Sequence, residues 1–316
     1  MTQPSSFVAT IDLALADKML ADLKNQGFAI TVPAYTVFSA KKPGISCTLY
    51  QSGKLMVQGK EMAQFIEFYL EPEILQSFTF SHPTAGLDLT PRIGIDESGK
   101  GDFFGPLCVA GVFAEGESIA ALKSLGVRDS KSLSDKQIHD IAAKIRASYA
   151  YHVVKINPTK YNEIYTQFKN LNRLLAWGHA TTIEELVNKT KCRQVIIDQF
   201  ADEHVVETAL KRKNLKVSLT QRHRGEEDLV VAAASILARD AFVDGIARLG
   251  RDFGIVLPKG ASAATIAAGR KFLEKHGQEK LPAVCKLHFK TLDAILTKNK
   301  NGLDESTGND LDYLED

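Results

Sequence analysis

Two apolar segments that each end in a carboxylate constrain the fold of this 316-residue chain more than any other feature. Ile93-Gly94-Ile95 leads into Asp96 and Glu97, and Val195-Ile196-Ile197 leads into Asp198. Short apolar runs are typical of buried strands, and ligands gather outside the carboxyl ends of neighbouring parallel strands. Because a protein interior does not accept uncompensated acids, the sequence predicts that the two strand ends meet at a cation site.

From Arg92 onwards, predicted strands alternate with predicted helices. Ser134-Asp135-Lys136-Gln137 is a capping-box signature that opens one helix, and the alanine-rich run from Leu229 to Leu249 forms another. We expect strands at 93–97, 107–114, 151–156, 194–198 and 216–221, and helices at 134–148, 171–189, 229–249, 267–276 and 286–298. This alternation indicates an α/β (α+β) fold, with a mixed sheet flanked by helices.

Residues 1–80 are expected to form a separate small module. Helical periodicity over 12–26 precedes segments with the alternating or β-branched residues of strands, at 28–32, 35–39, 45–51 and 54–58, and a second helix follows at 59–70. Proline, glycine and small polar residues mark 81–91 as the linker to a larger domain at 92–300. Residues 301–316 form an acidic tail whose composition predicts disorder.

Charge is distributed unevenly along the chain. The segment 302–316 contains six acids and no lysine or arginine, so the net charge of +1 becomes +7 when this tail is left out. A basic body suits a polyanionic partner. Between Phe28 and Lys60 the chain contains lysines but no acid. That pattern predicts either an ordinary solvated sheet surface or a face that lies along a phosphate backbone.

Composition also bounds the cellular setting. No apolar stretch is long enough to span a bilayer, and the N-terminus lacks the basic and apolar regions of a signal peptide. The four cysteines, Cys47, Cys108, Cys192 and Cys285, are scattered without paired spacing, which is typical of reduced thiols. We therefore expect a cytoplasmic monomer without membrane contact.

A third group of acids, Glu226, Glu227 and Asp228, precedes the alanine-rich helix. Acids at helix starts are favoured by capping and by the helix dipole, but one of the three could project toward Asp96 and Asp198. Carboxylates without an interleaved histidine or cysteine suit Mg²⁺ or Mn²⁺ rather than zinc. Since two such ions held close together hydrolyse phosphodiesters, an acidic cluster in a basic body predicts nuclease chemistry.

The stretch from Gly94 to Lys100 also matches the start of a P-loop, G-x-x-x-x-G-K. Gly101, however, occupies the position of the Ser or Thr that would bind Mg²⁺. Asp96 and Glu97 would also stand inside the phosphate cradle. The match therefore does not predict nucleotide hydrolysis.

Four motifs, in this order along the chain, resemble the signature of the type 2 ribonuclease H family. They are Gly94-Ile95-Asp96-Glu97-Ser98-Gly99-Lys100-Gly101-Asp102 with Phe104-Gly105-Pro106, Asp129-Ser130-Lys131-Ser132-Leu133, Ile196-Ile197-Asp198-Gln199-Phe200, and Val231-Ala232-Ala233-Ala234-Ser235-Ile236-Leu237-Ala238-Arg239. The form of the first motif, the run Asp198-Gln199-Phe200-Ala201, Leu257-Pro258-Lys259-Gly260-Ala261 and the separate N-terminal module are similar to the ribonuclease HIII branch.

The resemblance implies an endoribonuclease that cleaves the RNA strand of RNA–DNA hybrids with two Mg²⁺ or Mn²⁺ ions, leaving 5′-phosphate and 3′-hydroxyl ends. It also implies a ribonuclease H-like domain at 92–300, preceded by a TATA-binding-protein-like, helix–sheet–helix module at 1–80 that binds substrate. Asp96, Glu97 and Asp198 would be the catalytic metal ligands, with Glu226 as the fourth and Asp228 as second choice. Substrate contacts would come from Ser98, Gly99, Lys100, Gly101, Ser130 and Lys131.

Two other functions stay open at this point. A ribonuclease HII-like enzyme incises a duplex at a single embedded ribonucleotide. A non-catalytic hybrid-binding protein would use the same acids only as caps of strands and helices. The presence of Asp96 and Asp198 at two strand ends favours an enzyme over the second of these.

Overall fold

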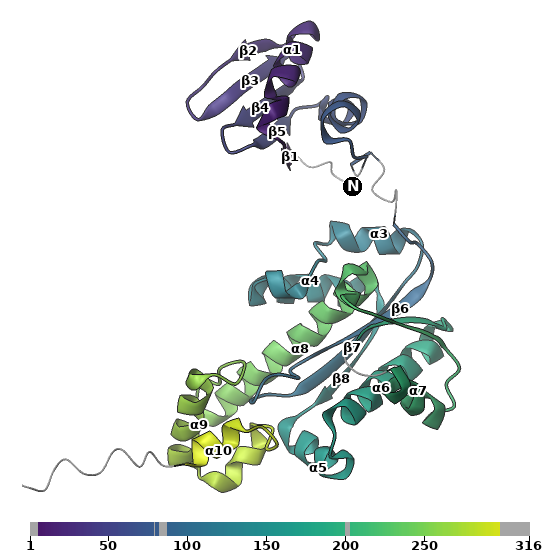
Figure 1. The fold of residues 1–316 in the computed structure, drawn as a ribbon, viewed down its shortest axis with the longest axis vertical. Helices are drawn as coiled ribbons and strands as arrows, with labels where there is room; N and C mark the ends of the chain where they lie inside the picture. Colours follow the sequence, from purple (N-terminus) through teal and green to yellow (C-terminus); the bar gives the residue numbers. More distant parts are fainter. Residues whose placement is uncertain (1–5, 79, 82–86, 200–202, 298–316) are drawn as a thin grey trace, which may run out of the picture. The chain divides into compact units, whose positions relative to one another are not determined.

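The computed structural model describes residues 6–78, 80–81, 87–199 and 203–297 (Figure 1). It divides the chain into two compact units, Met1–Asp88 and Leu89–Asp316. The predicted tail at 301–316 and residues 82–86 of the predicted linker lie outside the described residues. The predicted domain limits and the separate roles of the domains stay predictions.

The first unit contains a five-stranded antiparallel sheet in the order β1-β5-β4-β3-β2. Its strands are β1 (Ser6–Thr10), β2 (Ala29–Thr31), β3 (Thr36–Lys42), β4 (Ile45–Tyr50) and β5 (Lys54–Gln58), and helix α1 spans Ala16–Asn25. The four predicted strands and the first helix are confirmed. Strand β1 was not predicted, because it lies at the sheet edge, where partial burial leaves a weak apolar pattern and Val8 is exposed.

The second helix of this unit runs further than predicted. Helix α2 (Met62–Phe65) continues as a π-helix over Ile66–Leu75, so the predicted end at residue 70 is wrong. Glu71 explains the extension, since its buried carboxylate accepts backbone N–H groups from Phe80 at 2.6 Å and Ser81 at 3.0 Å. The wider π-helical turn also accommodates Pro72, which has no N–H to donate.

The second unit is built on a mixed sheet in the order β10-β9-β6-β7-β8. The strands are β6 (Arg92–Ser98), β7 (Leu107–Ala114), β8 (Ala150–Ile156), β9 (Gln194–Asp198) and β10 (Ser218–Arg222). Strands β6, β9 and β10 run parallel, whereas β7 and β8 pair antiparallel. All five predicted strands are present, and the expected mixed sheet flanked by helices is confirmed.

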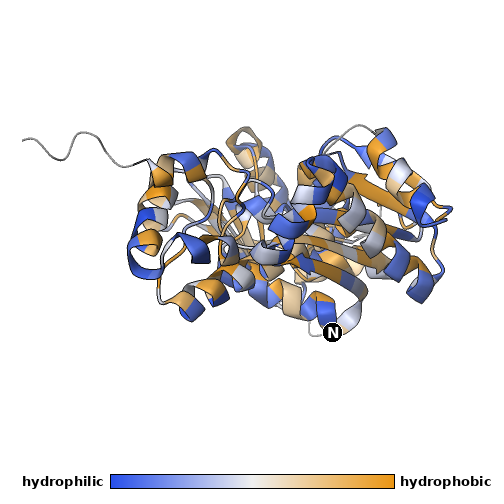
Figure 2. Ribbon diagram, turned by 90° about the horizontal axis from the view of Figure 1, so that it is seen from below, coloured by the Kyte–Doolittle hydropathy of each residue, from blue (hydrophilic) through white to orange (hydrophobic). Residues whose placement is uncertain are grey.

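Helices cover both faces of this sheet (Figure 1). Helices α8 (Leu229–Phe253), α3 (Glu117–Ser124) and α4 (Asp135–Ser148) share one apolar core with β7, and α5 (Pro158–Phe168), α6 (Leu171–Thr190) and α7 (Glu203–Arg212) share another with β6 and β9. The helices carry both apolar and polar stretches, as surface helices do (Figure 2). The predicted capping box of α4 is present. The short helices α3, α5 and α7 were not predicted.

The C-terminal helices share an apolar core with the second half of α8, where Phe242 and Ile246 lie. Helix α9 spans Ala263–His276, and α10 covers only Thr291–Leu296. The predicted helix at 286–298 is wrong over its first five residues. The reason is Lys286, whose buried Nζ donates to the carbonyl oxygens of Asp102 at 2.7 Å and Gly105 at 2.8 Å. Its backbone N–H also donates to the Phe103 carbonyl at 2.9 Å, so residue 286 is tied to the loop after β6 and the helix begins only at Thr291.

Candidate active site

The two carboxylate-bearing strands are neighbours. Strand β6 pairs with β9 in parallel, with Ile95 opposite Ile197. Asp96 and Asp198 follow these residues directly, so both carboxylates lie at the carboxyl edge of the sheet, where ligands gather in such folds. The predicted meeting of the two strand ends is therefore confirmed.

Gly94 lets helix α8 approach this edge closely. A Cβ atom at residue 94 would lie 2.4 Å from the carbonyl carbon of Val230 and from the nitrogen of Val231, too close for any side chain. The first turn of α8 therefore packs directly on β6. Further along the helix, the Ser235 hydroxyl hydrogen-bonds the carboxylate of Asp96.

Gly225 brings a third acid to the same place. Its backbone N–H donates to Asp198 Oδ1 at 2.8 Å, and a Cβ here would lie 2.7 Å from the Cα of Asp198. The turn Gly225–Glu227 is thus held against the end of β9. Glu226 lines the same hollow as Asp96, and its Oε1 lies 3.5 Å from the Nζ of Lys131.

The other two acids of this group are engaged elsewhere. Asp228 caps α8 by accepting N–H groups from Val230 at 2.9 Å and Val231 at 3.2 Å, and its Oδ2 pairs with Arg92. Glu227 is exposed and pairs with Arg224. The geometry therefore favours Glu226 as the fourth acid and gives Asp228 a structural task.

All ten residues predicted for the site surround one hollow of about 400 Å³. They are Asp96, Glu97, Ser98, Gly99, Lys100, Gly101, Ser130, Lys131, Asp198 and Glu226, joined by Asp102, Asp129, Ser235, Arg239, Phe242 and Lys259. The structure thus brings the predicted residues together. Their individual roles stay predictions.

The acids repel one another in this hollow. Burial raises the pKa of Asp96 to about 7, and the negative charge of Glu97, with a smaller effect from Asp198, adds to the rise. Hydrogen bonds from Ser235 and from the backbone of Glu97 oppose it. A carboxyl group whose pKa is raised in this way gains its full negative charge when a nearby cation lowers that pKa again.

The glycines of the loop after β6 differ in their structural need. Gly99 has φ +90°, and a Cβ there would lie 2.3 Å from the carbonyl oxygen of Pro106, so the fold itself requires glycine. Gly101 has no atom within 4 Å of its Cβ position. Its small size leaves open space toward the hollow, and Lys100 points an ammonium group to within 3.7 Å of Glu97 Oε1.

The turn Ser130–Ser132 is held to α8 by two contacts that the sequence interpretation missed. The hydroxyl groups of Ser130 and Ser235 lie 2.9 Å apart, and Arg239 Nη1 donates to the Ser130 carbonyl at 2.9 Å. Ser235 also bonds Asp96, so one side chain links the turn to the carboxylates. The available signal was a serine inside the apolar, alanine-rich first part of the helix, Leu229–Ala238.

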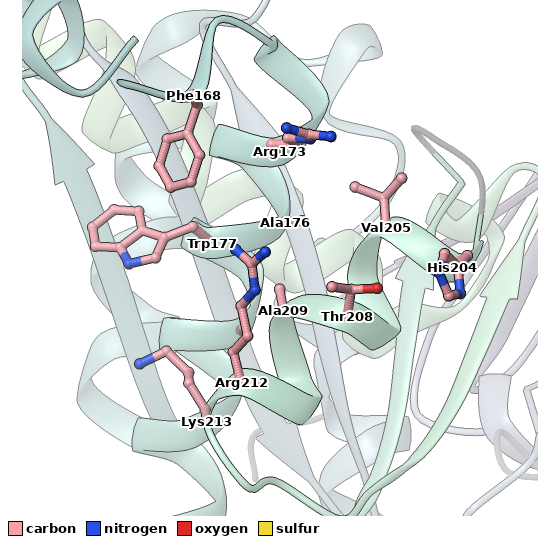
Figure 3. A pocket seen from close by; sticks show the side chains of 11 residues that line it. Phe168, Arg173, Ala176, Trp177, His204, Val205, Thr208, Ala209, Arg212 and Lys213 are labelled. Atoms are coloured by element: carbon pink, nitrogen blue, oxygen red, sulfur yellow. The ribbon is translucent and has the colours of Figure 1, made fainter. Parts of the chain in front are cut away.

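A second pocket, of about 340 Å³, lies between α6 and α7 (Figure 3). Phe168 and Trp177 form its aromatic wall, and Arg173, Arg212 and Lys213 also line it. The described residues that line it include no carboxylate and none of the predicted site residues. This pocket therefore lacks the groups for the proposed chemistry.

Comparison with known proteins identifies the family. The model of the family described as "Ribonuclease HII" matches residues 93–292, and a domain of unknown function (DUF3378) matches residues 6–81. Ribonuclease HIII of Protochlamydia amoebophila is 65% identical over 298 residues, which cover 94% of this chain and 99% of that protein. The chain belongs to the ribonuclease HIII family. Ribonuclease HIII of Chlamydia felis is 50% identical, with 92% of this chain and 97% of that protein covered.

Solved structures agree with this membership. Bst-RNase HIII in complex with Mn²⁺ has a TM-score of 0.64 at 29% identity and covers 92% of this chain and 98% of its own. Aquifex aeolicus RNase H3 has a TM-score of 0.53 at 26% identity, with 89% and 99% covered. As a member of the ribonuclease HIII family, the chain is a ribonuclease H, an endoribonuclease, and the predicted family and enzyme class are confirmed.

Proposed function

We propose that this endoribonuclease hydrolyses the RNA strand of RNA–DNA hybrids at the hollow between β6, β9 and α8, leaving 5′-phosphate and 3′-hydroxyl ends. The observation that carries the proposal is the meeting of Asp96, Glu97, Asp198 and Glu226 beside the loop Gly99–Gly101. Acids that repel one another suit a site that gains cations with its substrate. The adjoining glycine loop suits close contact with a nucleic acid backbone.

The four carboxylates fit Mg²⁺ or Mn²⁺. They offer only oxygen donors, and such hard ligands suit these ions. Among the described residues, no three His, Cys, Asp or Glu side chains by themselves form a metal-binding group. Mg²⁺ is usually held by one or two carboxylates together with substrate phosphates, and water completes its shell. When bound, two such ions supply an activated water and stabilise the leaving oxygen.

The protein groups around the acids would orient the substrate. Backbone groups of Ser98, Gly99 and Gly101 can approach a 2′-hydroxyl, the group that distinguishes RNA from DNA. Lys100 and Lys131 have exposed side chains, 36% and 77% accessible, that can contact backbone phosphates. Ser130 would fix the turn that presents Lys131, through its bond to Ser235.

The first unit would bind the hybrid. Lys41 and Lys54 lie on β3 and β5, and alternation along the strands places them on the sheet face that also carries Ser46, Met56 and Gln58. Both lysines are exposed, and no acid occurs between residues 28 and 60. A lysine-bearing face without acids suits a phosphate backbone.

We further propose that the protein acts as a monomer in the cytoplasm. All four cysteines are free, and three of them are buried, which fits a reducing compartment. No helix in the described part of the chain has the length and apolarity needed to cross a bilayer.

Three labelled substrates test the proposal: an RNA–DNA hybrid, the same RNA as a single strand, and a DNA duplex with one ribonucleotide. With Mg²⁺ or Mn²⁺, we expect cleavage of the hybrid and none of the single strand. Efficient incision at the single ribonucleotide would instead indicate ribonuclease HII-like specificity. No cleavage of any substrate with either ion would contradict the enzymatic proposal and favour a non-catalytic hybrid-binding protein.

A further inference from the structure

A fully buried histidine contacts one of the proposed metal ligands from the sheet face opposite α8. His179 on α6 has no exposed surface, and its Nε2 lies 3.0 Å from Glu97 Oε2. Helix α6 covers the sheet face opposite α8, so this imidazole approaches the site from the side remote from Ser235. His179 does not line the hollow itself.

The local sequence of α6 fixes this imidazole in place. Gly178 lets the helix lie close to β7, because a Cβ there would come within 2.9 Å of the Val109 side chain. One turn away, the buried hydroxyl of Thr182 donates to the Gly178 carbonyl at 3.0 Å. Leu175 and Ile183, on the same helix, belong to the apolar core. His179 thus lies on a regular helix among buried, closely packed neighbours.

Asp96 and Glu97 are anchored from opposite faces of the sheet. Neighbouring residues of a strand point to opposite faces; accordingly, Asp96 is bonded by Ser235 of α8, and Glu97 by His179 of α6. The two oxygens of Glu97 also have different neighbours, since Oε1 lies 3.7 Å from Lys100 Nζ at the hollow and Oε2 faces the histidine.

We propose that His179 is a positioning residue for Glu97. Its Nε2–H donates to Oε2 and fixes the rotation of the carboxylate, which leaves Oε1 directed to the hollow. Partners that orient metal-ligating groups in this way raise metal affinity about 10–100-fold. The inference rests on the proposed function, because it takes Glu97 as a metal ligand.

Two amide variants of the full-length protein separate positioning from packing. In His179→Gln the amide nitrogen reaches the position of Nε2, whereas in His179→Asn it reaches only that of Nδ1. Calorimetric titration with Mn²⁺, without nucleic acid, should give near wild-type affinity for His179→Gln. The same titration should give affinity weakened by about 10–100-fold for His179→Asn. Thr182→Val, equally buried on the same helix, is the matched control and should bind Mn²⁺ as the wild type does.

Glu97→Gln distinguishes the possible failures. If Glu97→Gln weakens Mn²⁺ binding while the Asn and Gln variants of His179 bind equally well, the positioning role is wrong and the proposed metal site stands. If Glu97→Gln binds Mn²⁺ as tightly as the wild type, the assignment of Glu97 and the role of His179 are both wrong. Thermal unfolding of each variant confirms that the comparison is made between folded proteins.

Discussion

Arg92 and Asp228 form a buried ion pair, with the guanidinium Nε 2.8 Å from the carboxylate Oδ2 and only 6% and 5% of the two side chains exposed. The pair joins the first residue of β6 to the N-cap of α8. It therefore sets the helix against the strand that carries Asp96. An acid that the sequence offers as a metal ligand is thus used to build the site.

Substitution of Asp228 should lower the stability of the protein, whereas substitution of Glu226 should lower its activity. Asp228→Ala leaves the Arg92 charge buried without its partner and should lower the free energy of unfolding by about 3–5 kcal/mol. Glu226→Gln should change the free energy of unfolding by less than about 0.5 kcal/mol, as is usual for a partly exposed residue. It should lower kcat by more than about 100-fold, which exceeds the effect of removing a residue that only orients a metal ligand. Denaturant unfolding and hybrid cleavage measure the two. A folded Asp228→Asn without turnover, beside an active Glu226→Gln, would reverse the assignment.

The two loop glycines provide a matched pair for substrate recognition. Gly101→Ala places a methyl group in open space, so we expect unchanged stability and a raised KM for the hybrid. Gly99→Ala should destabilise the fold, since φ is +90° and the new atom would meet the Pro106 carbonyl. Thermal unfolding and steady-state kinetics check both variants. A Gly101→Ala enzyme with wild-type KM would show that the substrate does not approach this residue.

These relationships show what the sequence could predict. Asp96 and Asp198 were recognisable because each ends a short apolar run, and the structure pairs those two runs in parallel. Ser235 and His179 were not recognisable in the same way. Each is a buried polar residue on a helix, and its task depends on which strand that helix covers.

The C-terminal segment shows a second reason why a prediction from sequence fails. Helical periodicity predicted a helix from residue 286, but the long-range bonds of Lys286 to Asp102 and Gly105 override local preference. Similarly, the predicted end of the second helix near residue 70 ignores the bonds of Glu71 to residues 80 and 81. Local patterns predict elements, whereas buried polar contacts decide where those elements end.

Lys286 should give stability a distinctive dependence on pH. Burial lowers the pKa of Lys286 to about 8, although Asp102 opposes the shift. In the unfolded chain the lysine pKa is about 10.4. Between these values the unfolded state holds the extra proton, so stability rises with pH, by up to about 3 kcal/mol from this group. Lys286→Met should lack this rise.

Denaturant unfolding at pH 7 and pH 9.5 measures the effect as a difference between wild type and Lys286→Met. The comparison cancels groups common to both proteins, including the buried cysteines, whose raised pKa values act in the opposite direction. Equal changes of stability with pH in the two proteins would show that Lys286 does not titrate abnormally.

The lysines of the first unit should contribute to affinity rather than to chemistry. Replacing Lys41 and Lys54 by glutamine should weaken hybrid binding and reduce the slope of log Kd against log salt by about 1 for each phosphate that a lysine no longer neutralises. The value of kcat at saturating substrate should not change. Lys18→Gln is the control, since Lys18 lies on α1 and pairs with Glu73. An unchanged salt slope in the double variant would show that the lysine-bearing face does not contact the phosphate backbone of the hybrid.

The most direct test of the account is hybrid cleavage by Asp96→Asn in Mg²⁺ or Mn²⁺, measured with hybrid binding in the same preparation. Asp96 lies near the carboxyl end of β6, bonded by Ser235 and the backbone of Glu97, and the amide keeps its shape without its charge. We expect loss of detectable cleavage while the hybrid is still bound with an affinity close to that of the wild type. Cleavage at the wild-type rate by this variant would contradict it.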